Sequence, residues 1–336
     1  MIGMVNTGGG TGGTLMVTAP AGVTVTVSKD GKTKTKVAGA DGLAVFKGLK
    51  SGQWTLTITD GEQTASKTVE IVTDYATEIS YNVIPEFTYT GDFEIVNDSD
   101  EPITTSQDNW KIRFLTSGTL TFTKLNGAEN GIDVFCVGGG GAGGNWCSGG
   151  SDGSGGCGGY TKTSKNVSVT TGNGYSIVIG AGGVCPTVEN SIGKSGGKTS
   201  AFGKSANGGS GGHAWADSTP GSGGSGGGSG NEDKTQGGNG GSDGGNGGSG
   251  NWSGGNGQGT TTREFGETSG KLYAGGGGGS WYGVGGAGGG AAYGNSAKAN
   301  TGGGGGGGYN ATGVKTTVGG SGGSGIVIIR NAREVA

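Results

Sequence analysis

The stretch TGGGGGGGYN, residues 301–310, places seven consecutive glycines before Tyr309, and GIVIIR follows at residues 325–330. Taken alone, such a glycine tract is typical of a flexible tether. A tether has no need of the apolar run Ile326–Ile329, which favours burial in a core. The sequence therefore predicts that the tract belongs to a folded domain, whose chain leaves a β-core and later returns to it.

Glycine divides the chain of 336 residues into two unlike parts. Only 17 of the 90 glycines lie in residues 1–137, and 73 lie in residues 138–336. The second part is thus about one-third glycine, against about 7% in an average protein. The two parts must be stabilised differently, because glycine has no side chain to bury.

Residues 14–84 alternate apolar and polar residues in short runs, and in one run Trp54, Leu56 and Ile58 share one face of a strand. Between the runs lie dipeptides that favour the positive φ angles of tight hairpin turns: Asp30-Gly31, Asp41-Gly42 and Asp60-Gly61. We therefore predict a small antiparallel, Ig-like β-sandwich after a flexible lead over residues 1–13.

The stretch GLAVFKGLKSGQWTLTIT, residues 42–59, resembles the PEGA or carboxypeptidase-regulatory-like family of small β-sandwiches. The matching positions are Gly42, Phe46, Gly48, Leu49, Gly52 and Trp54. The resemblance implies a sandwich that serves as an attachment or spacer module.

Residues 85–137 continue the β pattern, and we expect them to form the core of the second domain. Residues 138–324 are glycine-rich but contain strand-like runs at 160–170 and 175–180, and residues 325–336 form a closing strand and tail. Either the glycine segments are disordered, or they pack as extended helices of the polyproline-II type with three residues per turn. We favour the bundle, since glycine permits close backbone approach and keeps its N–H donor. The predicted fold class is all-β plus polyglycine-II.

Composition argues against several classes of partner. The net charge is −3, charged residues make up 14% of the chain, and we expect no cluster of Lys and Arg, so a nucleic-acid partner is not predicted. No apolar run approaches the roughly 20 residues of a membrane helix. The start MIGMVNTGGG lacks the features of a secretory signal. We therefore expect a protein that either stays in the cytosol or leaves by another route, such as assembly into a virion in the host cytoplasm followed by lysis.

The sequence offers no evident metal site, cofactor site or catalytic nucleophile. Four cysteines, Cys136, Cys147, Cys157 and Cys185, form no CxxC pair, and His213 is the single histidine. Zinc sites require closely spaced Cys and His ligands, and an activated Ser or Cys requires a neighbouring base. We predict free thiols, although one or two disulfides are an alternative, and a protein that is not an enzyme.

Aromatic residues within the glycine-rich part are the candidate receptor contacts. They are Trp146, Trp215, Trp252, Trp281, Tyr282, Tyr293 and Tyr309. Exposed aromatic rings on loops between rigid segments suit stacking on sugars or packing against a protein. The alternative is that each ring fills a gap where glycine leaves no bulk.

An ordered series of motifs resembles a glycine-rich domain of phage tail and receptor-binding proteins. The motifs are NWKIRFLTSGTLTFTKL, IDVFCVGGGGAGG, GGYTKT, YSIVIGAGG, GGKTSAFG, GQGTTTREFGE, LYAGGGGG and GGSGIVIIR, within about residues 87–332. The resemblance implies a β-core with inserted glycine helices and, through it, binding to a host surface glycan or protein. It implies no particular binding residue.

These observations lead to one function and two alternatives. We expect a phage or prophage structural protein of the tail or baseplate, which contacts other virion proteins, forms a possible homo-oligomer and displays the glycine-rich domain to the host. A bacterial surface or matrix adhesin is the first alternative, and a glycan-active enzyme is the second.

Overall fold

The computed structural model is an all-β protein. It describes residues 3–6, 12–60, 63–80, 84–103, 109–125, 128, 130–146, 153–214, 221–230, 237–241, 244–247, 253–254, 261–280, 282–309 and 317–333. The helical content of these ranges is one short 3-10 turn, η1, at Glu264–Gly266. The predicted all-β class is therefore confirmed.

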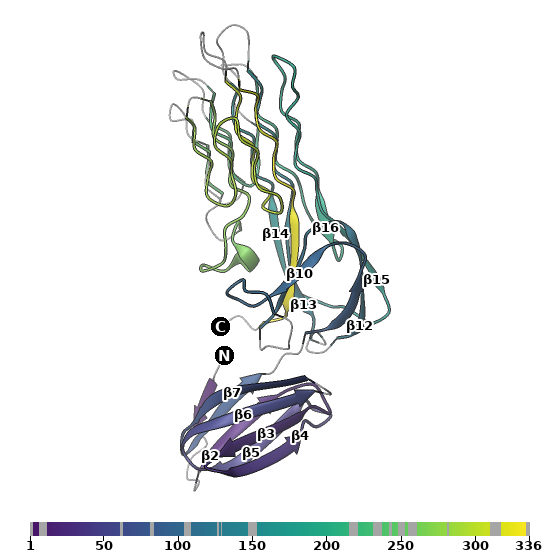
Figure 1. The fold of residues 1–336 in the computed structure, drawn as a ribbon, viewed down its shortest axis with the longest axis vertical. Coiled ribbons are helices and arrows are strands. Elements are labelled where there is room, and N and C mark those ends of the chain that lie inside the picture. Colours follow the sequence, from purple (N-terminus) through teal and green to yellow (C-terminus); the bar gives the residue numbers. More distant parts are fainter. Residues whose placement is uncertain are drawn as a thin grey trace.

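The N-terminal part is a β-sandwich of two four-stranded sheets (Figure 1). One sheet has the order β1-β8-β2-β5 and the other β4-β3-β6-β7. All neighbouring pairs are antiparallel except β2 and β8. The strands are β1 Gly3–Asn6, β2 Gly13–Thr18, β3 Thr24–Lys29, β4 Lys32–Val37, β5 Leu43–Leu49, β6 Gly52–Asp60, β7 Gln63–Ile71 and β8 Tyr75–Ser80.

The predicted alternation places the expected side chains in the sandwich core. Trp54, Leu56 and Ile58 are all buried. Asp30 and Gly31 both have positive φ, as the predicted hairpin turn between β3 and β4 requires. The flexible lead predicted for residues 1–13 differs from the structure, because Gly3–Asn6 pair with β8 and Gly13 begins β2.

The second part contains two five-stranded sheets with a shared apolar core. Their orders are β10-β11-β18-β13-β14 and β17-β16-β15-β12-β9. The strands are β9 Glu86–Tyr89, β10 Phe93–Val96, β11 Lys111–Phe114, β12 Gly118–Lys124, β13 Ile132–Val137, β14 Thr161–Val167, β15 Gly174–Val178, β16 Thr199–Ala201, β17 Lys204–Ala206 and β18 Ile326–Asn331.

The last strand closes this core, as the sequence predicts. β18 lies between β11 and β13 and pairs antiparallel with both, so that Ile328 is opposite Arg113 on one side and Phe135 on the other. Every residue of β18 is buried. The chain thus leaves the sheet at Val137, rejoins it as β14 at Thr161–Val167, and returns for the last time at Ile326, almost 190 residues after Val137.

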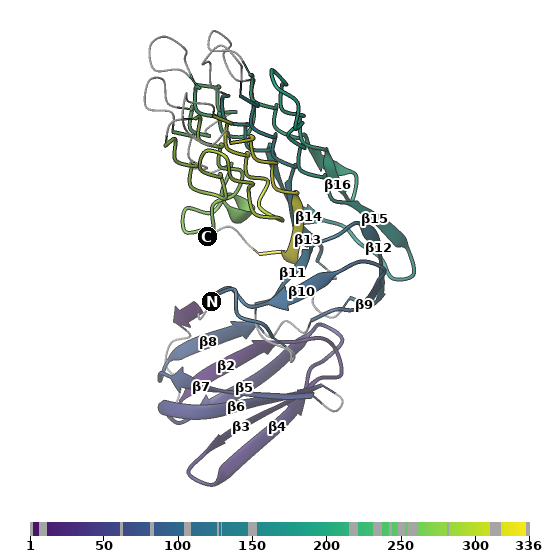
Figure 2. The same cartoon turned by 45° about the horizontal axis from the view of Figure 1, so that its top comes forward.

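The glycine-rich segments run side by side away from β13, β14 and β18 (Figures 1 and 2). They carry almost no regular strand, yet their backbones are hydrogen-bonded to one another. The tract 302–308 is surrounded by such partners. Its N–H donors and their carbonyl acceptors are Gly304 to Gly275, Gly305 to Gly141, Gly306 to Asn295, Gly307 to Gly278 and Gly308 to Gly144. Gly304 and Gly307 thus donate to one neighbouring segment, and Gly305 and Gly308 donate to another, so the partner segment repeats after three residues in these two pairs.

The packing leaves no room for a side chain in the middle of this tract. A Cβ atom added to Gly305 would lie 2.1 Å from the carbonyl oxygen of Gly320. At Gly307 the corresponding distance to the carbonyl oxygen of Gly153 is 2.0 Å. Both contacts are with backbone, which cannot turn aside. Glycine is therefore required here by its neighbours, and the tract is not a tether.

Candidate functional site

The hydrogen bonds of the glycine-rich region define an end that is remote from the β-core. At the near end, the N–H of Gly325 donates to Gly180 just before β18 begins. At the opposite end, the N–H of Gly308 donates to the carbonyl of Gly144 at 2.8 Å. We call this opposite side the far end; its described residues are 144–146, 186–192, 278–280, 282–284, 292–294 and 307–309.

Four of the predicted aromatic residues lie at the far end. Tyr282 is 76% exposed, and its ring makes an edge contact with that of Tyr293, with centroids 5.5 Å apart. Trp146 is partly exposed and follows the buried Asn145. Tyr309 is partly exposed and ends the seven-glycine tract. The structure therefore brings together residues that are far apart in sequence.

The backbone fixes the position of the tyrosine pair relative to the tract. The N–H of Tyr293 donates to Gly283 at 3.0 Å, and the N–H of Gly294 donates to Gly307 at 2.9 Å. Tyr309 exchanges two backbone hydrogen bonds with Thr317, each of 2.8 Å. Trp215, Trp252 and Trp281, also predicted as receptor contacts, lie outside the described residues.

A second group of apolar side chains at the far end was missed by the sequence analysis. Val188 and Ile192 are 67% and 55% exposed, and Val184 lies just below them on the same hairpin. The side-chain amide of the buried Asn145 donates to the carbonyl of Val188 at 2.8 Å and to that of Pro186 at 3.0 Å. This anchor holds the hairpin tip next to Trp146. Val184, Val188 and Ile192 recur every four residues, which matches no strand period, so the search for β-strands in the sequence did not identify them.

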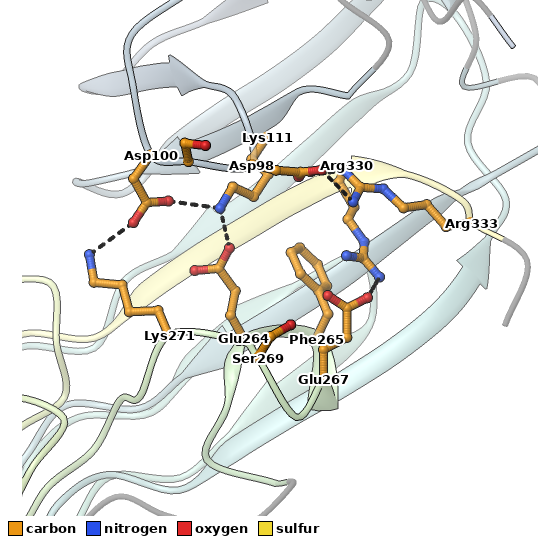
Figure 3. Close-up of a pocket in the computed structure, with 12 residues that line it drawn as sticks. Asp98, Asp100, Lys111, Glu264, Phe265, Glu267, Ser269, Lys271, Arg330 and Arg333 are labelled. Atoms are coloured by element: carbon orange, nitrogen blue, oxygen red, sulfur yellow. Dashed lines mark hydrogen bonds and ion pairs between the residues drawn. The ribbon is translucent and has the colours of Figure 1, made fainter. Parts of the chain in front are cut away.

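The other candidate is a charged pocket at the near end, with a volume of about 370 Å³ (Figure 3). The segment 261–273, which contains η1, forms one wall, and the β10–β11 connection and the end of β18 form the others. Four carboxylates and four cations line it: Asp98, Asp100, Glu264, Glu267, Lys111, Lys271, Arg330 and Arg333. Each has a partner of opposite charge among the described residues.

Two basic residues of β11 form the buried centre of this pocket. The Lys111 Nζ lies 2.7 Å from Asp100 Oδ1 and 2.8 Å from Glu264 Oε1. Arg113 also pairs with Asp100. Tyr273 donates from its hydroxyl to Glu264 Oε2 at 3.1 Å, which completes the environment of that buried carboxylate. Figure 3 shows Lys111 between Asp100 and Glu264.

Arg330 of β18 makes the second set of contacts. Its Nε lies 3.1 Å from Asp133 Oδ2, its Nη2 lies 2.6 Å from Glu267 Oε1, and its guanidinium lies 4.1 Å from the ring centroid of Phe265. Phe265 has a φ of 55°, a strained backbone for a bulky residue. The stacking of Arg330 on its ring helps to hold that conformation.

The pocket holds two carboxyl groups in their ionised form. Burial opposes ionisation of Asp100, but the hydrogen bond from Lys111 and the charge of Arg113 outweigh it, so the pKa of Asp100 lies below its ordinary value. Burial likewise opposes ionisation of Glu267, and the hydrogen bond and charge of Arg330 lower its pKa. The arrangement docks segment 261–273 onto the sheet through matched charges.

The predicted free thiols are confirmed for three cysteines. Cys136, Cys157 and Cys185 are free and buried, and Cys147 lies outside the described residues. Burial raises the pKa of the Cys157 thiol to about 11, and its Sγ lies 2.7 Å from the carbonyl oxygen of Gly221. A thiol in this state is a poor nucleophile.

In the described part of the chain, no helix is long and apolar enough to cross a bilayer. Within the same ranges, no group of three or more His, Cys, Asp or Glu side chains is placed to hold a metal ion.

The family model of a glycine-rich domain matches residues 115–332, which span β12 to β18 and every glycine-rich segment. A search of curated proteins finds no match to the chain.

Proposed function

The chain belongs to the glycine-rich domain family, and from this premise we propose that it is a non-enzymatic virion protein of the tail or baseplate of a phage or prophage. Its glycine-rich domain is a rigid platform for recognition of the host surface, with a receptor protein or a cell-wall glycan as the ligand. The far end is the contact surface.

Rigidity follows from the proposed conformation of the glycine segments. We infer that they are helices of the polyglycine-II type, three residues per turn, packed as a bundle. Two observations support this. The partner segment repeats after three residues for Gly304 and Gly307 and for Gly305 and Gly308, and a Cβ at Gly305 would strike a neighbouring backbone. In such a bundle, backbone hydrogen bonds connect each segment to several neighbours, and they would hold the far end in a fixed shape.

The observation that carries the proposal is the exposure of aromatic and apolar side chains at the far end. Tyr282 exposes 76% of its surface beside Tyr293, and Val188 exposes 67% of its own on the hairpin held by Asn145. Exposed aromatic rings on a preorganised surface lose little conformational entropy on binding. They suit either sugar stacking or a protein receptor.

The N-terminal sandwich would attach the platform to the virion. Its resemblance to PEGA-like modules supports a role as spacer or adaptor between the glycine-rich domain and other tail proteins. Several copies on one particle would add avidity to weak individual contacts. Assembly in the host cytoplasm and release by lysis complete this proposal.

The test is binding of purified protein to host cells and to isolated cell-wall polysaccharide. We expect the double substitution Tyr282→Ala/Tyr293→Ala to weaken binding about tenfold, the effect of losing one hot-spot contact. The matched control is Tyr75→Ala on the sandwich, a tyrosine that is 36% exposed. Unfolding free energies of both variants should stay within about 0.5 kcal/mol of wild type, as for surface changes.

Two outcomes would contradict the proposal. Unchanged binding by the double variant would exclude the tyrosine pair as a contact. Release of oligosaccharide from the polysaccharide would instead identify a glycan-active enzyme. Detection of the protein on purified virions, or on uninfected bacterial surfaces, separates the virion protein from a bacterial adhesin.

A further inference from the structure

A cluster of basic residues lies in the N-terminal sandwich, where the sequence analysis expected none. Residues 29–50 contain six lysines and only two carboxylates, whereas the whole chain has a net charge of −3. The expectation overlooked the run KDGKTKTK at residues 29–36, which holds four of the six lysines, and the fold adds Lys47 of β5 beside Lys34 and Lys36. The six lysines are Lys29, Lys32, Lys34, Lys36, Lys47 and Lys50.

The lysines of β4 point toward the open side of the sandwich. Lys34 is paired in register with Val27 of β3, and Lys36 with Val25. Both valines are fully buried, and paired residues lie on the same face of a sheet. The two lysines therefore share the core-facing side of β4, at the rim where the core ends.

This rim is an open seam between the two sheets. β4 is the last strand of its sheet and β5 is the last strand of the other, so each has one edge without a neighbouring strand. A hollow of about 340 Å³ lies between them, with Val45 and Phe46 on its floor and lysines at its sides. Figure 2 shows β4 on the side of the sandwich that faces away from the glycine-rich region.

The lysine charges of the seam are not neutralised within the described part of the chain. Lys34 Nζ donates to the backbone carbonyl of Lys47 at 3.4 Å, and Lys36 Nζ lies 5.9 Å above the ring of Phe46. None of the three lysines of β4 has a carboxylate partner there. The seam is thus a positively charged groove with an apolar floor.

We propose that this seam binds an extended acidic segment of a partner protein. The segment adds as a strand to the free edge of β4, and its Asp or Glu residues at alternate positions face Lys32, Lys34 and Lys36. Alternate residues of both strands are about 6.8 Å apart, so the charges match along the whole strand. The proposal concerns the N-terminal sandwich and does not depend on recognition at the far end.

Lysines on an edge strand also have a protective role, since they prevent two identical edges from pairing. The same repulsion selects the partner, because an acidic strand gains cross-strand ion pairs where a second copy of β4 would lose them. A polypeptide is favoured over another polyanion because the unpaired edge of β4 supplies backbone donors and acceptors for a further strand.

The test uses the full chain and an eight-residue peptide of alternating Glu and Val. We expect binding that shifts the backbone amide resonances of β4 and that weakens as salt is added. The double substitution Lys34→Glu/Lys36→Glu should weaken binding at least tenfold. Lys204→Glu, at an exposed lysine of β17, is the matched control and should bind like wild type.

Two further probes decide between strand addition and general attraction of anions. The same peptide with every backbone nitrogen methylated keeps its charge but has no N–H donor on either edge, so it cannot form a ladder and should lose binding. Equal binding of the methylated peptide, or of inorganic polyphosphate, would overturn the proposal in favour of nonspecific polyanion binding. Absence of any shift in β4 at millimolar peptide would overturn it outright. Retained amide dispersion in the Lys34→Glu/Lys36→Glu variant confirms that it is folded.

Discussion

The sandwich and the glycine-rich region solve the problem of burial in opposite ways. The sandwich buries side chains such as Leu15, Leu56 and Ile71, each with no exposed surface. The glycine-rich region buries backbone, and the contacts of Gly305 and Gly307 are with the peptide groups of neighbouring segments. The sandwich is stabilised mainly by removing apolar surface from water. The glycine-rich region is stabilised mainly by hydrogen bonds between closely packed segments of the chain.

The difference shows what a chain without side chains needs in order to fold. Glycine loses more backbone entropy than any other residue when it is ordered. Each hydrogen bond contributes only about 0.5–1.5 kcal/mol net, so nearly every peptide group must find a partner. The near-complete pairing along residues 304–308 meets that requirement. A single defect in this pairing should therefore lower the unfolding free energy of the glycine-rich domain by more than a defect in the sandwich core lowers that of the sandwich.

The largest effect is expected for Gly305→Val, which introduces atoms where a Cβ alone would lie 2.1 Å from the carbonyl oxygen of Gly320. Backbone must move, and each displaced segment loses hydrogen bonds to its own neighbours. We expect the unfolding free energy of the glycine-rich domain to fall by more than about 4 kcal/mol, a range that single substitutions rarely reach. Denaturant titration, followed by amide exchange, measures the loss.

The matched control is Gly174→Ala at the start of β15. A Cβ at this glycine would lie 3.2 Å from a methyl group of Thr119 and 3.9 Å from Thr121 Oγ1, and both are side chains that can adjust. We expect a change below about 1 kcal/mol, because one small shift suffices. Equal stability of Gly305→Val and wild type would mean that the tract is a tether after all.

A smaller effect is expected for Leu56→Ala in the sandwich. Leu56 is fully buried on β6, and removing most of its side chain leaves a cavity. The cost should be about 3 kcal/mol, within the usual range for leucine. The two regions also differ in tolerance: Leu56→Met should cost less than about 1.5 kcal/mol, whereas no residue is a conservative replacement for Gly305.

Thiol labelling can report which region has opened in these variants. Cys157 lies in the glycine-rich region with no exposed surface, and burial raises its pKa to about 11. We expect Gly305→Val to accelerate its alkylation and Leu56→Ala to leave the rate unchanged. Equal acceleration by both variants would contradict separate stabilisation of the two regions.

Much of the fold was predictable from sequence because side-chain patterns survive in the strands. The alternation around Trp54 and the apolar run Ile326–Ile329 each specify a buried face, and both predictions are confirmed. The path of the glycine segments was not predictable, since identical residues carry no pattern that distinguishes one neighbour from another. The partners of residues 302–308 come from segments throughout the domain, so their positions depend on how the whole domain folds.

The sites were less predictable for a related reason. Lys111 and Arg113 alternate with the core residues of β11, which normally indicates a solvent-facing side of a strand. Both are buried instead, because segment 261–273 covers them and supplies Glu264. That contact spans more than 150 residues of sequence. The far-end tyrosines were found because composition alone singles out aromatic rings among glycines.

The smallest effect concerns the charged contact that joins the β-core to segment 261–273. The folded pKa of Asp100 lies below the ordinary value of 3.8, so ionised Asp100 stabilises the fold. This contribution is complete at pH values well above 4 and is lost as the pH falls through the lowered pKa. Partial exposure limits it to about 1 kcal/mol. Urea titrations between pH 7 and pH 2 measure this loss.

The substitution Asp100→Asn removes the charge of the side chain and keeps a residue that tolerates the same backbone conformation. Asp100 has a φ of 64°, a conformation that Asn also adopts readily. We expect the variant to be about 1 kcal/mol less stable than wild type at pH 7. The two stability curves should converge as the pH falls through the lowered pKa of the wild-type carboxyl, which then becomes neutral. A difference that persists at low pH would assign the effect to geometry. Convergence would show that matched charges join segment 261–273 to the β-core of the second part. Neither the sandwich core nor the hydrogen-bonded glycine segments use this kind of contact.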